Sequence, residues 1–191
     1  MPVSHQNEHI HFLGLCGSLR RVSSNLSLLR AALTLLPAGV EMRIAEPLDR
    51  LPHFNPDLDL DPAIPCVAGF RQEVAAASAL IICSPEYAFG VPGVLKNALD
   101  WLVSSGEVYE KPVALITGSP NHGGAAQAQR HLNDTLRAQG ARLVEGACVS
   151  VPFVRTRFDA AGTLVDAEIS RALSAGLAAL AEAARAGAEP A

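Results

Sequence analysis

The sequence lacks the features that would direct it to a membrane, a nucleic acid or the secretory route. Its 191 residues contain no apolar run near the roughly 18 residues that a membrane helix needs. Its formal net charge is −4, whereas a nucleic-acid-binding protein is expected to carry a basic face. The first nine residues contain neither Lys nor Arg and no apolar segment, so no secretory signal is predicted.

Cysteine is also sparse, and the catalytic motifs of hydrolases are missing. The four cysteines include no C-x-x-C pair, which favours reduced thiols and a cytoplasmic location. No Ser-His-Asp order, H-E-x-x-H motif or Cys/His cluster occurs. His5, His9 and His11 lie in or next to the N-terminal tail, residues 1–9, which is expected to fray. We therefore predict no metal site and no protein nucleophile.

The chain does contain a regular alternation of apolar runs and helical stripes. Strands are predicted at 10–16, 40–45, 79–83 and 113–117, with a broken strand over 142–151. Five helices are predicted from stripes such as Leu26-Leu29-Leu33-Leu36, and others centred near residues 74, 98, 132 and 177. This alternation predicts one α/β domain, residues 10–187, with a parallel sheet between two helical layers.

One stretch interrupts this alternation. Pro47–Pro65 contains five prolines and alternating Asp and Leu residues over 57–61. So long an irregular segment in a compact domain is usually a functional or partner-facing loop. A solvated surface crossover is an equally good interpretation, and we assign no chemistry to this segment.

The segment Gly17–Asn25, between the first strand and its helix, has the composition of a phosphate-binding loop. Gly17 permits a tight turn, three serines and Asn25 supply hydrogen bonds, and Arg20 can pair with a dianion. The helix N-terminus adds free N–H groups and the positive end of a dipole. A serine that only caps the helix is the simpler alternative, but a cap does not explain Arg20 and Asn25.

Other phosphate-binding motifs fit this loop poorly. The glycine patterns of a Walker loop and of a dinucleotide fingerprint are both missing. A cysteine phosphatase places Arg six residues after its nucleophile, and Val22 occupies that position after Cys16. The phosphatase interpretation is therefore disfavoured.

A second informative segment, residues 84–101, follows the buried run that ends at Cys83. Its loop carries Tyr87 and Phe89, flat rings that suit a flat ligand, and a helix is expected to start at Pro92. Open α/β sheets bind ligands at the carboxyl ends of their strands, where this loop is predicted to lie.

The two segments together resemble the NADPH-dependent FMN reductase family. The resemblance rests on Gly17-Ser18-x-Arg20-x-x-Ser23-x-Asn25 and Pro85-Glu86-Tyr87-x-x-Gly90-x-Pro92-Gly93-x-Leu95-Lys96-Asn97. It implies a flavodoxin-like fold with sheet order 2-1-3-4-5 and bound FMN. It also implies that Ser18, Arg20, Ser23 and Asn25 hold the FMN phosphate, while Pro85, Glu86, Tyr87 and Gly90 line the ribityl chain and ring edge. The loop after the fourth strand is expected to supply a third contact through Ser119, Gly123 and Gly124.

The chain departs from the family at one position of this motif. The family commonly has Asn after Pro-Glu-Tyr, and this chain has Ala88. The side-chain amide at the flavin rim is therefore missing, so only backbone contacts are expected from residue 88.

The resemblance implies an FMN-dependent NAD(P)H oxidoreductase with ping-pong kinetics that reduces a small acceptor, such as a quinone, free flavin, azo compound or metal oxyanion. A flavodoxin-type electron carrier is the alternative, although carriers tend to be more acidic than this chain. NADPH and NADH are equally open, because nothing in the sequence ranks Arg21, Arg155 and Arg157 as partners of a 2′-phosphate. The family also implies a homodimer or homotetramer, with the helix 92–103 and Trp101 as a contact face, unless Trp101 belongs to the core.

Overall fold

The computed structural model describes residues 9–188 of the chain. Its centre is a parallel sheet in the order β2-β1-β3-β4-β5, in which β6 also pairs with β4. The strands are β1 Ile10–Cys16, β2 Val40–Ile44, β3 Ala79–Ser84, β4 Pro112–Gly118, β5 Arg142–Leu143 and β6 Val149–Val151. The predicted strand order and the parallel α/β class are therefore confirmed.

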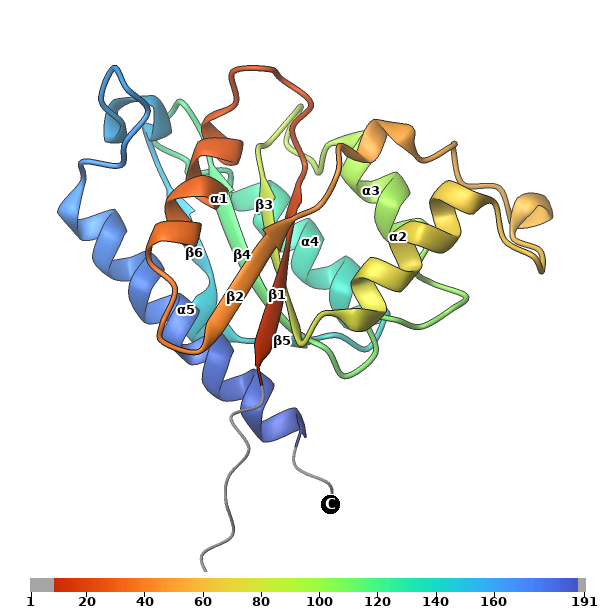
Figure 1. Cartoon of the computed structure of the whole chain (residues 1–191). Helices are drawn as coiled ribbons and strands as arrows, with labels where there is room; N and C mark the ends of the chain where they lie inside the picture. The colour runs from red at the N-terminus through yellow and green to blue at the C-terminus, as the bar shows by residue number, and fades with distance from the viewer. Residues whose placement is uncertain (1–8, 189–191) are drawn as a thin grey trace, which may run out of the picture.

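Helices cover both faces of the sheet, as Figure 1 shows. α1 and α5 pack on one face, and α2, α3 and α4 pack on the other, so that each face has its own apolar cluster. The helices span α1 Ser24–Thr34, α2 Pro65–Ala76, α3 Gly93–Asp100, α4 Ala126–Ala138 and α5 Ala167–Ala188. The loops that follow β1 and β3 lie at the same edge of the sheet, the upper edge in Figure 1.

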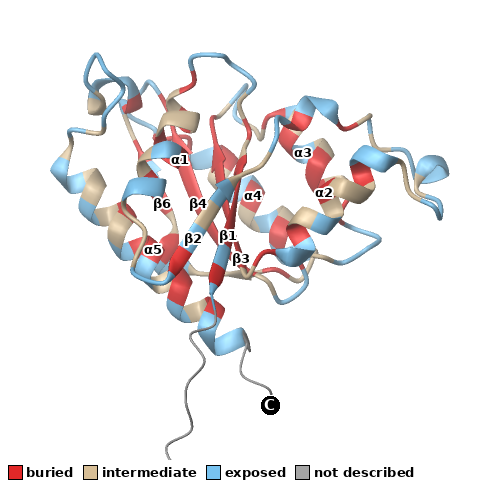
Figure 2. Cartoon of the chain, viewed as in Figure 1, coloured by how far each residue is buried: buried red, intermediate tan, exposed pale blue. Residues whose placement is uncertain are grey.

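The two central strands are buried along their whole length. Every residue of β3 and β4 is buried, which explains why both strands appear in the sequence as continuous apolar runs. Figure 2 shows these buried strands in red between the helices. The last strand is broken, as predicted, because the 3-10 turn η3, Glu145–Ala147, separates β5 from β6.

Of the leucine stripe predicted for α1, only Leu29 is buried. The buried residues of this helix are Asn25, Leu28, Leu29 and Ala32, whereas Leu33 is exposed and Leu36 follows the helix. The true stripe has the helical spacing i, i+3, i+4 and i+7. It was missed because its first member is the polar residue Asn25.

One detail of α3 differs from prediction, and the structure decides between the two alternatives for Trp101. The helix begins at Gly93, and Pro92 precedes it with an extended ψ of 134°. Trp101 lies just beyond the helix and is 1% exposed, packed edge-on against Phe54. Trp101 therefore belongs to the core and forms no contact face.

The proline-rich segment 47–65 is attached to the body by polar contacts. The Asn97 side chain accepts a hydrogen bond from the Phe54 N–H (2.7 Å) and donates one to the Pro52 carbonyl (2.9 Å). The Trp101 indole N–H donates to the same carbonyl (2.8 Å). Asn97, the last residue of the second family motif, thus holds this loop against α3.

The same segment contains two short 3-10 turns: η1 Leu48–Arg50 packs on the body with Leu48 buried, whereas η2 Pro56–Leu58 lies in the outer part that projects from it. Leu58 and Leu60 are exposed there. An ion pair between Arg71 and Asp59 (2.9 Å) fixes the base of this projection to α2.

Within residues 9–188, no helix is both long and apolar enough to cross a membrane. The same residues hold no group of three or more metal-ligating side chains. Of the N-terminal tail predicted over residues 1–9, all but His9 lies outside the described part of the chain.

Candidate functional site

A cleft of about 280 Å³ lies at the carboxyl edge of the sheet, between the loops that follow β1, β3 and β4 and the turn η4, Val154–Arg157. It brings together seven of the predicted site residues: Ser18, Arg20, Ser23, Asn25, Pro85, Glu86 and Tyr87. Five further residues line it: Ser24, Gly118, Pro120, Val154 and Arg155. The two sequence motifs therefore face one common space.

The phosphate-loop side of the cleft is formed by the first turn of α1. The Ser23 hydroxyl caps this helix by accepting a hydrogen bond from the Leu26 N–H (3.3 Å). The N–H groups of Ser24 and Asn25 lie in the first turn and have no intrahelical partners. Ser23 thus does act as a cap, while the adjacent N–H groups give this side of the cleft its anion-binding character.

Asn25 connects two of the loops. Its side chain is 5% exposed, and its Nδ2 donates to the Gly118 carbonyl (3.2 Å) at the end of β4. The thiol of Cys83, near the end of β3, donates to the Asn25 backbone carbonyl (3.1 Å). Asn25 therefore holds the ends of β1, β3 and β4 in a common arrangement as well as lining the cleft.

Glu86 has a structural role that its motif did not reveal. Its carboxylate accepts hydrogen bonds from the N–H groups of Gln127 (2.8 Å) and Ala128 (3.0 Å) in the first turn of α4. A carboxylate at this position satisfies free donors and interacts favourably with the helix dipole. Glu86 thereby attaches the loop after β3 to the helix after β4.

Tyr87–Gly90 forms a tight two-residue hairpin turn. Tyr87 and Gly90 exchange backbone hydrogen bonds of 3.1 and 2.9 Å, and both central residues, Ala88 and Phe89, have positive φ (49° and 60°). Asn tolerates this left-handed conformation better than Ala, so the Asn usual in the family suits the backbone of residue 88. The turn leaves the rings of Tyr87, which lines the cleft, and of Phe89 exposed.

Four predicted residues do not line the cleft: Gly90, Ser119, Gly123 and Gly124. Ser119 donates its hydroxyl to Asn121 (2.6 Å), inside the loop after β4. Gly124 has a positive φ of 57°, and a Cβ there would overlap the Ser150 hydroxyl. The requirement for glycine at residue 124 therefore arises from packing against β6.

Arg155 lines the cleft but belongs to neither sequence motif, so its place in this site was not predicted. It belongs to η4, which follows β6 and lies far from both motifs in the sequence. The only signal was its inclusion among three candidate arginines. Arg157, another candidate, forms an ion pair with Asp166 (2.7 Å). The hydrogen bond from the Ile169 N–H, and then those from Arg157 and the Glu168 N–H, hold the pKa of the Asp166 carboxyl below its usual range.

The thiols near the cleft are poor nucleophiles. Burial raises the pKa of the Cys16 thiol, and it raises the pKa of Cys83 well above the usual value. Both thiols therefore stay protonated near neutral pH, where a cysteine phosphatase needs a thiolate. This agrees with the rejection of the phosphatase interpretation.

Comparison with known families identifies the origin of this arrangement. The model of the NADPH-dependent FMN reductase family matches residues 10–156, which include every element that contributes to the cleft except the end of η4. The chain belongs to this family.

Individual relatives agree with the family match. The chain is 35% identical over 162 residues to an NAD(P)H-dependent FMN reductase of Pseudomonas aeruginosa, covering 84% of this chain and 87% of the relative. It is 34% identical to an NADPH:quinone oxidoreductase of Arabidopsis thaliana, with coverage of 82% and 83%. The solved structure of FerB, a flavoenzyme NAD(P)H:(acceptor) oxidoreductase from Paracoccus denitrificans, superposes with a TM-score of 0.83 at 27% identity, covering 93% and 98%.

The cleft has the donors that the FMN of this family requires. Arg20, Ser18, Ser23 and Ser24 line it beside the first-turn N–H groups of α1, which suits a phosphate. Pro85 and Tyr87 add apolar surface, which suits a ring. The residues present therefore fit FMN.

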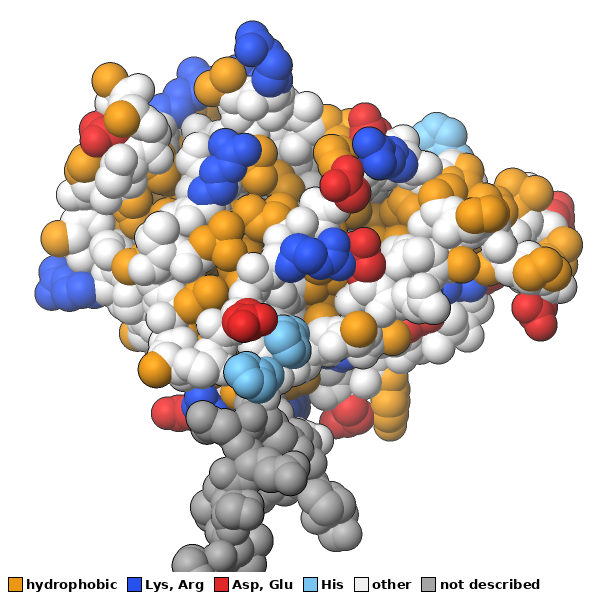
Figure 3. All heavy atoms as spheres, in the orientation of Figure 1, with side chains coloured by type: hydrophobic (Ala, Val, Ile, Leu, Met, Phe, Trp, Pro, Cys, Tyr) orange, Lys and Arg blue, Asp and Glu red, His pale blue; other side chains and the backbone are white. Residues whose placement is uncertain are grey.

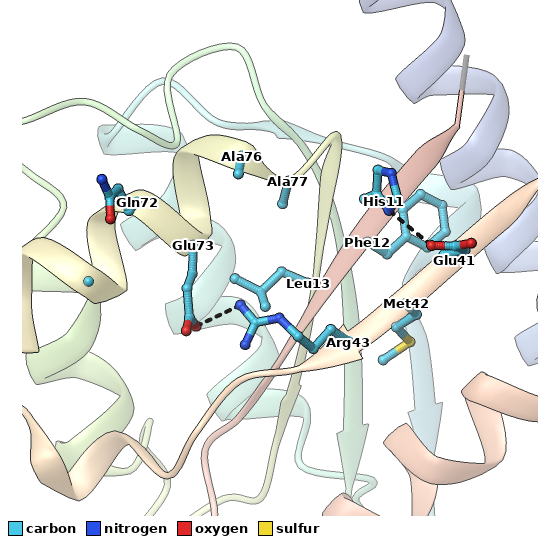
Figure 4. A pocket seen from close by; sticks show the side chains of 11 residues that line it. His11, Phe12, Leu13, Glu41, Met42, Arg43, Gln72, Glu73, Ala76 and Ala77 are labelled. Carbon is cyan, nitrogen blue, oxygen red and sulfur yellow. Dashed lines mark ion pairs between the residues drawn. The ribbon is translucent and has the colours of Figure 1, made fainter. Parts of the chain in front are cut away.

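A larger groove, of about 740 Å³, lies away from this cleft, over β1, β2 and α2. Figure 4 shows that polar side chains on its rim pair with one another, Arg43 with Glu73 (3.0 Å) and the His11 Nδ1 with the Glu41 carboxylate (3.4 Å). It contains none of the predicted site residues. Because these polar side chains already pair with one another, we assign no ligand to this groove.

Proposed function

We propose that the protein is an FMN-dependent NAD(P)H oxidoreductase that reduces quinones. The observation that carries this proposal is the cleft in which both family motifs meet, in a chain that belongs to the NADPH-dependent FMN reductase family. When bound, FMN supplies the redox chemistry between the nicotinamide nucleotide and the acceptor, so the protein needs no nucleophile of its own.

The protein's own part in the reaction is binding and orientation. Ser18, Arg20, Ser23 and Asn25 are proposed to hold the FMN phosphate at the N-terminus of α1. Pro85, Tyr87 and the Glu86 backbone are proposed to line the ribityl chain and ring edge, since the Glu86 carboxylate is occupied at α4. Gly90, Ser119, Gly123 and Gly124 would act by shaping the loops around them.

Quinones are the proposed acceptors because relatives carry that activity in their names. Besides the Arabidopsis enzyme, the chain is 35% identical to a 2-hydroxy-1,4-benzoquinone reductase of Burkholderia, covering 82% of this chain and 86% of the relative. The exposed rings of Tyr87, which lines the cleft, and of Phe89 in the same turn offer apolar surface to a flat acceptor. No comparable observation favours the electron-carrier alternative.

Steady-state kinetics test this proposal. Protein reconstituted with FMN is expected to oxidise NADPH or NADH with a benzoquinone acceptor, and parallel double-reciprocal lines would indicate the ping-pong order. Ferricyanide and free FMN serve as further acceptors, and the comparison of the two nucleotides measures the donor preference. Absence of NAD(P)H oxidation with every acceptor would contradict the proposal.

We further propose a homodimer or homotetramer in the cytoplasm. The exposed Leu58 and Leu60 on the projecting loop and the exposed Phe89 in the turn after β3 support an assembly that covers them, and Figure 3 shows hydrophobic side chains on that projection. The four unpaired cysteines support a reducing compartment. Light scattering coupled to size-exclusion chromatography measures the assembly, and a mass of one chain would contradict it.

A further inference from the structure

We propose that Arg155 is a second phosphate-binding residue, which holds the phosphate of FMN together with Arg20. This inference rests on the proposed function, because it concerns the cofactor of that reaction. Arg20 follows β1 and Arg155 lies in η4 after β6, yet both side chains line the same cleft with Ser23 and Ser24. Fold topology therefore places a guanidinium beside the phosphate loop that no local motif contains.

The backbone on the N-terminal side of Arg155 is anchored. The Phe153 N–H donates to the Asn121 carbonyl (3.0 Å), and the Val154 N–H donates to the Ser119 carbonyl (2.9 Å). The Val154 side chain is buried and lies close to Gly118, where an added Cβ would come within 3.2 Å of it. These contacts fix the start of η4 against the loop that follows β4.

The backbone on the C-terminal side of Arg155 is anchored as well. The Arg157 side chain donates to the Pro152 carbonyl (3.1 Å) and to the Asp166 carboxylate (2.7 Å), which ties η4 to the start of α5. Arg155 stands between these two attachments with its own side chain exposed. Its position is thus held by neighbours while its charge is left for a ligand, and such pre-organisation reduces the entropy cost of binding.

The charge balance of the cleft favours a dianion. Among the residues that the structure describes, the guanidinium groups of Arg20 and Arg155 have no ion-pair or hydrogen-bond partner. The Glu86 carboxylate, in contrast, is occupied by two N–H groups of α4. Two free positive charges and the N-terminus of α1 match a phosphate monoester, which carries nearly two negative charges at pH 7. Figure 3 shows blue side chains at the upper edge of the molecule, over the loop after β1.

The structure also distinguishes the three arginines that the sequence left unranked. Arg157 is already paired with Asp166, and Arg21 is exposed but does not line the cleft. Arg155 lines the same cleft as Ser23 and Ser24, so the phosphate nearest to it is the one held at the N-terminus of α1. The 2′-phosphate of NADPH lies on the adenosine half, away from a nicotinamide stacked on the flavin, which makes it the less suitable partner.

Flavin titration tests the assignment. The flavin-free chain and its Arg155→Gln, Arg155→Lys and Arg21→Gln variants are titrated with FMN and with riboflavin, which lacks the phosphate, and binding is followed by flavin fluorescence. We expect Arg155→Gln to weaken FMN binding about 10-fold, the scale of one charge-assisted hydrogen bond, and to leave riboflavin binding unchanged. Arg155→Lys should restore part of the loss, and Arg21→Gln should match the wild type.

Two results of the titration would overturn the assignment. Unchanged FMN affinity in Arg155→Gln would exclude Arg155 as a phosphate ligand, and equal losses for FMN and riboflavin would indicate a purely structural role. A higher KM for NADPH alone, with unchanged FMN affinity and unchanged KM for NADH, would assign Arg155 to the 2′-phosphate instead. If the wild type binds FMN but oxidises no NAD(P)H, the proposed function fails while the titration still decides the role of Arg155.

Discussion

Several side chains of the cleft serve the fold and the site at once. Ser23 caps α1, Asn25 bridges the ends of three strands, and Glu86 caps α4, although the motifs suggested cofactor contacts for all three. Arg20 differs from them, because its guanidinium has no partner among the described residues and is free for a ligand. Substitution at Arg20 should therefore affect cofactor binding with little effect on folding.

For Arg20→Ala we predict that FMN affinity falls by about 1.5–3 kcal/mol, the range for hydrogen bonds to charged groups. The melting temperature of the flavin-free chain should stay near that of the wild type, because Arg20 is exposed. Calorimetric or fluorescence titration with FMN measures the loss, and Arg21→Ala is the matched control. An unchanged affinity would contradict the assignment of the phosphate loop.

Ala88 is a strained residue, and its replacement by glycine should stabilise the protein. Its φ of 49° lies in the left-handed region, which costs a residue with a Cβ about 1 kcal/mol or more. We predict that Ala88→Gly raises the free energy of unfolding by about 0.5–1 kcal/mol. Urea denaturation measures this change.

Ala178→Gly provides the matched control, since Ala178 is exposed within α5. There the same substitution should lower the free energy of unfolding by about 1 kcal/mol. Destabilisation by Ala88→Gly of the same size as in the control would show that residue 88 is not strained.

At the scale of elements, short turns rather than long helices complete the cleft. The loop after β4 is held in place because the Gly124 carbonyl accepts hydrogen bonds from the hydroxyls of Thr117 (2.9 Å) and Ser150 (2.9 Å). These bonds attach the loop to both β4 and β6, and the same loop positions η4 through Ser119 and Asn121. The geometry of residue 124 therefore affects the cleft although the residue does not line it.

We predict that Gly124→Ala lowers the free energy of unfolding by about 2 kcal/mol or more. Its positive φ disfavours Ala, and the new Cβ would overlap the Ser150 hydroxyl. Gly123→Ala is the matched control, because its φ is not positive and its Cβ would meet only Asn121 Oδ1 at 3.4 Å. Equal effects of the two substitutions in thermal or urea denaturation would contradict this account of Gly124.

At the scale of the whole molecule, parallel topology brings the ends of β1, β3 and β4 to one edge, and side-chain contacts attach the long loops to the body. The outer part of the loop 47–65 is attached through Asp59, which accepts hydrogen bonds from Ser104 and Arg71. The Ser104 hydroxyl and then the Arg71 guanidinium hold the pKa of this carboxyl below its usual range. Attachment of the loop should therefore be sensitive to acid.

The sign of this pH dependence follows from the lowered pKa. The contribution of Asp59 to stability is complete above the unfolded carboxyl pKa, about 3.9, and is lost as pH falls through the lower pKa of the folded chain. We predict that wild type is more stable than Asp59→Asn at pH 7 and that this difference shrinks below about pH 4. Urea denaturation of both proteins across pH 7 to 3 measures it, and a constant difference would contradict the prediction.

The sequence by itself determined the fold class, the strand order through the family resemblance, and seven residues that line the cleft. Buried parallel strands and glycine- and serine-rich loops carry signals within a few neighbouring residues, so these features are visible in the chain. The prediction of the buried face of α1 was largely wrong because that face begins with a polar residue, Asn25, where an apolar one is expected.

Only the tertiary structure decided what the side chains do across long distances in the chain. It placed Glu86 at α4, Trp101 in the core and Asn97 against the proline-rich loop. It also placed Arg155 beside the phosphate loop. Each of these contacts joins segments tens of residues apart, and such pairings arise from how the strands align in the sheet, which no local pattern of residues encodes.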